Sequence, residues 1–166
     1  RNKNIKVYIN GEFHPREEAN ISVFDSGFLL GDGVWEGLRL FNNHIVFLKE
    51  HLDRLYSGAN KLAMDIGKSR DELIDLIEKT LDANKMKTGV HIRLIISRGL
   101  KKTPYQHPNT NTGDSSIVII PEFKEADKKV NIEGIRLVTV NIRRGTPDSQ
   151  DPRLNTLSKL NCIAAC

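Results

Sequence analysis

Two consecutive segments with helical periodicity lie in the first half of the chain, and they restrict the folds that it can adopt. Apolar residues recur three or four positions apart in the first segment, at Leu48, Leu52, Leu55, Ala59 and Leu62. The second opens with Ser69 and Glu72, the spacing of a capping box. It continues with one apolar face, formed by Leu73, Ile74, Ile77 and Leu81. Each helix would bury a single face, so both need a common surface to pack against.

Segments typical of β-strands flank this helical pair and can supply that surface. Before it, residues 7–9 enter an Asn10-Gly11 turn with a return at 12–13, and residues 34–41 turn at Asn42-Asn43 into 44–47. After it come three further β-rich runs, at residues 90–96, 116–120 and 135–142. Tight turns join antiparallel neighbours. The sequence therefore predicts an α+β fold, with an antiparallel sheet flanked by two helices.

The second half of the chain contains loops and a charged stretch that indicate a domain boundary. Residues 103–114 are rich in Pro, Asn and Thr, which favours a surface loop, and residues 125–129 are charged. A second loop at 145–152 precedes a short helix that runs to the end of the chain. Residues 130–166 are too few to hold a core of their own. We expect an N-terminal domain at 1–125 and, at 126–166, a linker with the beginning of a second domain whose remainder is absent.

Composition argues against several classes of protein. The 25 Lys and Arg residues exceed the 21 Asp and Glu residues only slightly and are mixed with them along the chain, so we expect no nucleic-acid binding. No apolar run approaches the roughly 20 residues of a membrane span, and no secretory signal is visible. The two cysteines, Cys162 and Cys166, are too few for a disulfide framework or a zinc site. We expect reduced thiols and a cytoplasmic protein.

The glycine-rich segment at residues 27–33 is superficially similar to a phosphate-binding loop. No Lys-Ser or Lys-Thr pair follows it, and the next element is a predicted strand rather than a helix, so a nucleotide-binding P-loop is excluded. The glycines are better explained by a tight bend and a close approach of the backbone. His44 and His51 lack partners at metal-binding spacing, so we expect no metal site and a structural or surface role for both.

Two basic residues can carry chemistry. Lys159 lies among apolar neighbours at the start of the last predicted helix, where desolvation would lower its pKa and make it an amine nucleophile. The alternative is a surface lysine on an amphipathic helix. Arg54, on the first predicted helix, offers a guanidinium that suits a phosphate. The alternative there is a solvated arginine paired with Glu50 or Asp53.

Several sequence blocks, taken in order, are similar to those of a known enzyme family. They lie at residues 7–12, 23–39, 51–55, 92–94 and 158–161, and so cover nearly the whole chain. This chain resembles the class IV aminotransferases, the fold-type IV pyridoxal-phosphate enzymes. That family includes branched-chain and D-amino-acid aminotransferases and aminodeoxychorismate lyase.

The resemblance implies pyridoxal 5'-phosphate as cofactor and gives roles to particular residues. Arg54 matches the arginine that binds the cofactor phosphate. Lys159 matches the catalytic lysine that holds the cofactor covalently and moves the substrate proton. The substrate pocket is assigned to four residues, Trp35, Glu36, Arg39 and Arg93. A guanidinium such as that of Arg93 suits a substrate carboxylate.

The chain departs from the family pattern in three places. A gapless match to the D-amino-acid type puts Asn155 at the lysine position, one helical turn before Lys159. An amide cannot condense with an aldehyde, so we assign the catalytic role to Lys159. Thr103 and Tyr105 stand where the D-amino-acid enzymes place a cationic carboxylate trap. The acidic partner of the pyridine nitrogen belongs to a part of the family's chain that is absent here.

The resemblance implies transamination of an amino acid with a 2-oxo acid by a homodimer of the branched-chain type. A lyase acting on an aminodeoxychorismate-like substrate is one alternative, and a non-catalytic binding protein on the same fold is another. Because half of the cofactor site is missing, we expect the 166-residue chain alone to be inactive.

Overall fold

The computed structural model describes residues 1–125 and 127–166, and its centre is one antiparallel sheet. Six strands follow one another across the sheet in the order β2-β1-β6-β5-β3-β4. Every neighbouring pair is antiparallel. The strands are β1 (Lys6–Ile9), β2 (Glu12–Pro15), β3 (Gly33–Phe41), β4 (His44–Val46), β5 (Val90–Ser97) and β6 (Ser116–Phe123). The predicted α+β class is confirmed.

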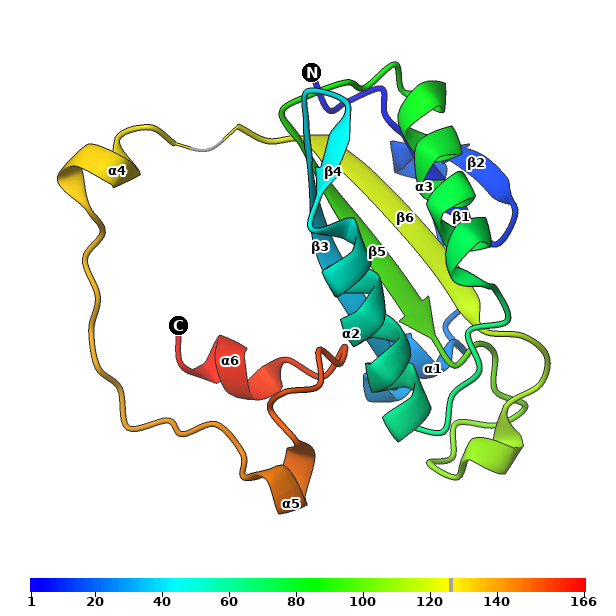
Figure 1. Cartoon of the computed structure of the whole chain (residues 1–166). Coiled ribbons are helices and arrows are strands. Elements are labelled where there is room, and N and C mark those ends of the chain that lie inside the picture. The colour runs from blue at the N-terminus through cyan, green and yellow to red at the C-terminus, as the bar shows by residue number, and fades with distance from the viewer. Residues whose placement is uncertain (126) are drawn as a thin grey trace.

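Helices α2 (Leu48–Lys61) and α3 (Arg70–Ala83) cover one face of this sheet (Figure 1). Their buried faces meet the inward side chains of the three central strands, and together they form the core. The fully buried members of that core are Leu38, Leu73, Ile77, Val90, Ile92, Leu94, Ile96 and Ile119. Neither helix, nor any other in the described residues, has the length and hydropathy to cross a bilayer.

Local signals in the sequence act as predicted at the turns and at the start of α3. Asn10 and Gly11 both have positive φ angles, 49° and 108°, as a two-residue hairpin of the I′ type requires. Asn42 and Asn43 do the same between β3 and β4, at 47° and 62°. Ser69 caps α3 through its side chain, and Glu72 accepts a bond from the backbone of Ser69, so the capping box is confirmed.

Arg98, which follows β5, ties the end of α2 to the segment before β3. Its guanidinium donates to both carboxylate oxygens of Asp32, over 2.7 and 3.1 Å. It also donates to the carbonyl groups of Leu62 and Ala63 at the C-terminal end of α2. Burial alone would raise the pKa of Asp32, but hydrogen bonds from Arg98 and Ser26 outweigh it and lower that pKa.

The prediction of a strand at residues 135–142 is wrong. These residues are exposed and form no strand; Leu137 and Val138 are 83% and 85% exposed. Their alternating pattern has no sheet to join among the described residues, and a lone strand leaves its backbone groups unpaired. After β6 the described chain forms only short helices, α4 (Val130–Glu133), α5 (Pro147–Gln150) and α6 (Leu160–Ala164). The helix α6 matches the predicted C-terminal helix.

Several short elements were not predicted from the sequence. They are η1 (Arg16–Glu18), α1 (Ser26–Leu30), η2 (Pro108–Thr110), and the helices α4 and α5. Of the described residues after 126, only Thr156 is buried. The predicted boundary between 125 and 126 falls on a residue outside the described part of the chain.

The core packing of α3 can be tested with two adjacent residues. Ile77→Ala removes a fully buried side chain and should lower the free energy of unfolding by about 2–5 kcal/mol. Glu78→Ala, at the next and exposed position, should change it by about 0.5 kcal/mol or less. Urea denaturation followed by circular dichroism measures both. Equal effects of the two substitutions would contradict the assigned face of α3.

Candidate active site

A short segment before α6 lies along the edge of β3 and brings Lys159 to the sheet. The backbone N–H of Trp35 donates to the carbonyl of Asn155, and that of Leu157 donates to the carbonyl of Gly33, both over 3.0 Å. Val34 and Thr156 form an antiparallel bridge between them. On this edge, β4 pairs only with Arg39 to Phe41, so the first half of β3 is free to accept residues 155–157.

The glycines at 27–33 make room for this segment. Gly31 caps α1 with φ at 68°, and a Cβ there would lie 3.1 Å from the Cα of Ser158. A Cβ on Gly27 would lie 2.8 Å from the side chain of Leu157. A Cβ on Gly33 would lie 2.7 Å from the same Leu157 side chain, and 2.4 Å from the carbonyl oxygen of Ile96 on β5. The predicted bend and close approach are therefore present, and what approaches is the segment that carries Lys159.

Lys159 stands at the N-terminal cap of α6, with its amine directed toward β3. The Nζ atom donates to the Oδ1 of Asn155 over 3.0 Å and lies 5.4 Å from the centre of the Trp35 ring. Burial is the largest influence on the amine and lowers its pKa; the charges of Arg144, Arg54 and Arg93 lower it further. A neutral amine is the form that can act as nucleophile or base.

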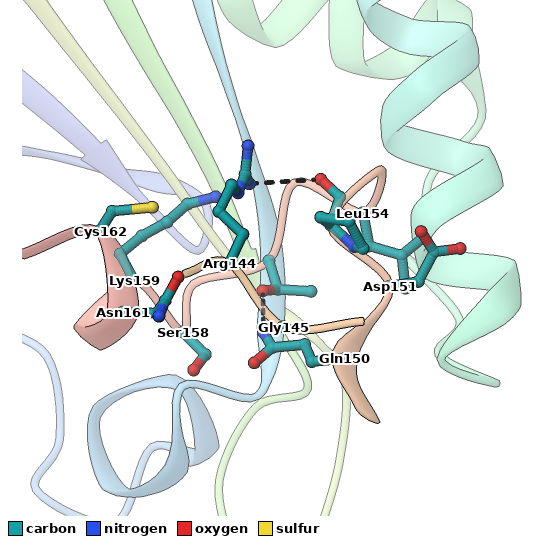
Figure 2. Close-up of a pocket in the computed structure, with 11 residues that line it drawn as sticks. Arg144, Gly145, Gln150, Asp151, Leu154, Ser158, Lys159, Asn161 and Cys162 are labelled. Carbon is teal, nitrogen blue, oxygen red and sulfur yellow. Dashed lines mark hydrogen bonds between the residues drawn. The ribbon is translucent and has the colours of Figure 1, made fainter. Parts of the chain in front are cut away.

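A pocket beside Lys159 is formed by the loop around α5 and the start of α6. In Figure 2 the side chains of Lys159 and Arg144 extend toward the same part of this pocket. Arg144 also donates to the carbonyl of Pro152, which holds the loop. Ser158, Asn161 and Cys162 line the remaining wall, and the loop contributes Gly145, Gln150, Asp151, Pro152, Leu154 and Thr156.

Arg54 projects from α2 and makes a two-pronged contact with Glu36. Its Nε donates to Oε1 of Glu36 over 2.6 Å, and Nη2 donates to Oε2 over 2.5 Å. His51 donates to the same Oε2 over 2.7 Å. Glu36 is fully buried, whereas the Arg54 side chain is 53% exposed. Hydrogen bonding to Glu36 raises the pKa of the Arg54 guanidinium.

Trp35, Arg39 and Arg93 lie on the sheet face opposite the two helices. The guanidinium carbon of Arg93 sits 3.8 Å from the centre of the Trp35 ring, a cation–π contact. Arg93 stands opposite Gly37 in the β3–β5 register, where no side chain obstructs it. Arg39 donates to the backbone carbonyl of Lys124. Burial lowers the pKa of His91 on this face, and the nearby charge of Arg93 lowers it further.

The predicted site residues thus divide between two faces of β3. Glu36 points into the helical layer and contacts Arg54, while Trp35 and Arg39 point to the open face, because side chains alternate along a strand. The alternative pairing of Arg54 with Glu50 or Asp53 is not found among the described residues. Asp53 instead pairs with Lys49 and Arg70. Thr103 and Tyr105 are exposed in the loop after β5.

Some residues of the site carried no signal in the sequence. Arg144 lies in a stretch for which the sequence indicates only a loop, and no sequence pattern points to a partner for His51. The bond between His51 and Glu36 joins a helix to a strand 15 residues away, which spacing within one element does not indicate. Among residues 1–125 and 127–166, no three His, Cys, Asp or Glu side chains cluster as a metal site would.

Comparison with known proteins assigns the chain to a family. The family model described as Amino-transferase class IV matches residues 33–166. The chain belongs to the class IV aminotransferases. The match includes β3, α2 and the segment that carries Lys159. It therefore covers the elements on which the candidate site is built.

Individual class IV relatives agree in sequence. A putative branched-chain-amino-acid aminotransferase of Methanocaldococcus jannaschii is 35% identical over 161 residues, which are 97% of this chain and 54% of the relative. The branched-chain-amino-acid aminotransferase-like protein 1 of Arabidopsis thaliana is 39% identical over 164 residues, 99% of this chain and 29% of the relative. This chain spans about half or less of the length of these curated relatives.

A solved structure of this class superposes closely on the chain. It is a branched-chain amino acid aminotransferase from T.th., complexed with N-(5'-phosphopyridoxyl)-L-glutamate, and it gives a TM-score of 0.82 at 26% identity. The superposition covers 99% of this chain and 54% of that structure. The sheet and helices of this chain correspond to the N-terminal domain of the fold.

The lowered pKa of Lys159 can be tested against another lysine of the chain. On the exposed face of α3, the Lys79 amine donates a hydrogen bond to Asp75, and this bond raises the pKa of Lys79. Only a neutral amine is acylated, so Lys159 should react with a midpoint at lower pH than Lys79. Pulsed acetic anhydride labelling over a pH series, with peptide mass spectrometry, measures both midpoints. A midpoint for Lys159 at or above that of Lys79 would be the contrary result.

Proposed function

We propose that the complete protein is a pyridoxal-phosphate-dependent aminotransferase that exchanges an amino group between an amino acid and a 2-oxo acid. The observation that carries the proposal is the setting of the Lys159 amine. It is partly buried beside the Trp35 ring and has three arginine charges around it. Burial and cationic neighbours lower a lysine pKa, as a lysine nucleophile requires.

The donor set fits a pyridoxal phosphate. Its aldehyde needs a reactive amine, for which Lys159 is the candidate, and its phosphate needs a cation. Arg54 gives one N–H of Nε and one of Nη2 to Glu36, and no protein partner of Nη1 is found in the described part of the chain. Because the side chain is half exposed, the remaining N–H groups can meet a phosphate. The ligand named for the solved relative from T.th. is itself a phosphopyridoxyl compound.

Each residue then has a defined task. When bound, the cofactor supplies the electron sink for the reaction. Lys159 would hold the cofactor through its Nζ atom and, when that atom is free, would move a proton there. Arg54 fixes the phosphate through a guanidinium that Glu36 and His51 hold in place. Trp35 presents its ring beside the amine and limits the access of water to it.

The substrates we propose are small amino acids and 2-oxo acids, as for enzymes of the branched-chain type. Arg93 and Arg39 project from adjacent strands on the same face of the sheet, and no acidic side chain pairs with either one in the described residues. A pair of guanidinium groups suits a second carboxylate, such as that of a glutamate co-substrate. We also propose a homodimer, with an N-terminal domain at 1–125 and the start of a cofactor domain at 126–166.

The covalent role of Lys159 has a direct test in the complete protein. Borohydride reduction after incubation with pyridoxal phosphate should leave a pyridoxyl group on Lys159, which peptide mass spectrometry identifies. Lys159→Ala should abolish this adduct and lower activity by several orders of magnitude, because no other group replaces the amine. Lys79 lies on α3, away from the candidate site, so Lys79→Ala should leave both the adduct and the activity unchanged. Retention of the adduct in Lys159→Ala would refute the assignment.

The phosphate contact of Arg54 can be separated from the rest of the site by comparing two ligands. Arg54→Gln should reduce the preference for pyridoxal phosphate over pyridoxal by about 10- to 100-fold, the value of one charge-assisted hydrogen bond at about 1.5–3 kcal/mol. Asp53→Asn changes the neighbouring residue, whose partners are Lys49 and Arg70, and should keep the preference. Equilibrium dialysis measures both ligands.

Arg54→Gln also leaves the carboxylate of Glu36 buried without its main partner, which can destabilise the fold. The double change Glu36→Gln and Arg54→Gln removes both charges together and serves as the folded comparison. A preference for pyridoxal phosphate that survives in the double variant would show that Arg54 does not bind the phosphate.

The products distinguish transamination from the lyase reaction. A transaminase should yield a new amino acid and a 2-oxo acid from two substrates, whereas release of pyruvate from a single substrate would indicate the lyase.

A further inference from the structure

We infer that Asn155 is a positioning residue, which holds the amine of Lys159 beside the Trp35 ring. The inference rests on the proposed function for its purpose, but the contact itself stands on geometry. Asn155 Oδ1 accepts from Lys159 Nζ over 3.0 Å, and Lys159 lies four residues further along the chain. Asn155 and Lys159 are therefore hydrogen-bonded partners, in which the amide oxygen holds the amine.

The orientation of the Asn155 amide is fixed by its other partner. Its Nδ2 donates to the carbonyl oxygen of Trp35 over 2.6 Å. A carbonyl can only accept, so the NH2 end must face Trp35, and Oδ1 must point the other way. An amine or ammonium group always offers a hydrogen, so both contacts require the same orientation.

The backbone around Asn155 is as firmly held as its side chain. Its carbonyl accepts from the Trp35 N–H over 3.0 Å, and the indole Nε1 of Trp35 donates to the carbonyl of Thr156 over 3.1 Å. Trp35 thus bonds to this segment through its N–H, its carbonyl and its ring. A side chain on such a support has little freedom, which is what positioning of a reactive group needs.

The surroundings of Lys159 explain why a neutral acceptor is suited to this place. Arg54 from α2, Arg93 from β5 and Arg144 from the loop before α5 all bring positive charge toward the amine, whereas Cys162 on α6 acts in the opposite direction. These three positive charges disfavour the ammonium form of Lys159. The Asn155 oxygen holds the amine in place without adding the negative charge that would stabilise the ammonium form.

The first test uses the pH midpoint of Lys159 acylation in the complete protein after removal of the cofactor. Asn155→Asp places a carboxylate beside the amine and should raise that midpoint by about one pH unit or more. Asn161→Asp is the matched control, because Asn161 lines the pocket beside Lys159 but its amide bonds to the carbonyl of Arg143. Asn161→Asp should shift the acylation midpoint of Lys159 by less than about half as much as Asn155→Asp does. The midpoint of Lys79 should stay constant in both variants. Equal shifts in the two variants would overturn the inference.

The second test removes the contact without adding charge. Asn155→Leu should slow the formation of the borohydride-trapped pyridoxyl adduct by roughly tenfold, because the amine is no longer held at one place. Reversible binding of pyridoxal phosphate before reduction should keep its affinity, since Arg54 is untouched. An unchanged rate of adduct formation would overturn the inference. Circular dichroism and the melting midpoint establish that each variant is folded.

The two proposals can fail separately. If the unaltered protein forms no adduct on Lys159, the proposed function is wrong, while the acylation midpoints still decide whether Asn155 holds the amine. If the adduct forms but neither Asn155 variant behaves as described, only the role of Asn155 is wrong.

Discussion

Strand β3 belongs to the core and to the candidate site at the same time, and the alternation of its side chains makes this double use possible. Val34, Leu38 and Leu40 point to the helices and are buried. Trp35 and Arg39 point to the opposite face. The strand also pairs on both edges, with β5 along one and with β4 and residues 155–157 along the other. A shift of one residue in its register would exchange the two sets of side chains and destroy both.

Glu36 is the exception among the side chains of β3 that point to the helices. It occupies a core position of β3, where every other inward side chain is apolar, and a buried charge is costly unless it is paired. Arg54 and His51 supply three hydrogen bonds to its carboxylate. The core thus sets the direction of a guanidinium whose other side reaches solvent. Stability and the proposed phosphate contact meet here, because the same bonds that satisfy Glu36 also orient Arg54.

The sequence predicted the parts of the fold that depend on neighbours along the chain. Paired Asn and Gly residues determine both hairpins, and Ser69 with Glu72 determines the start of α3. The prediction failed for residues 135–142, because a β pattern forms a strand only where a partner strand exists. The contact of Arg54 with Glu36 was also missed, since it depends on which strand lies beneath α2. The resemblance identified Lys159 and Arg54 as candidates. The hydrogen bond from Lys159 to Asn155 could not be predicted, because it depends on how residues 155–159 fold against β3.

The segment that carries Lys159 joins β3 across a long stretch of chain. Trp35 and its partners at 155 and 156 are separated by 120 and 121 residues, whereas the sheet is already complete at Phe123. Residues 155–157 follow all six strands in the chain, so during synthesis the strands are made before the segment that pairs with β3. We expect the sheet and its two helices to form first during synthesis, with the edge of β3 still unpaired. The reactive amine would then arrive last, so that a half-made chain presents no aldehyde-reactive centre at this edge.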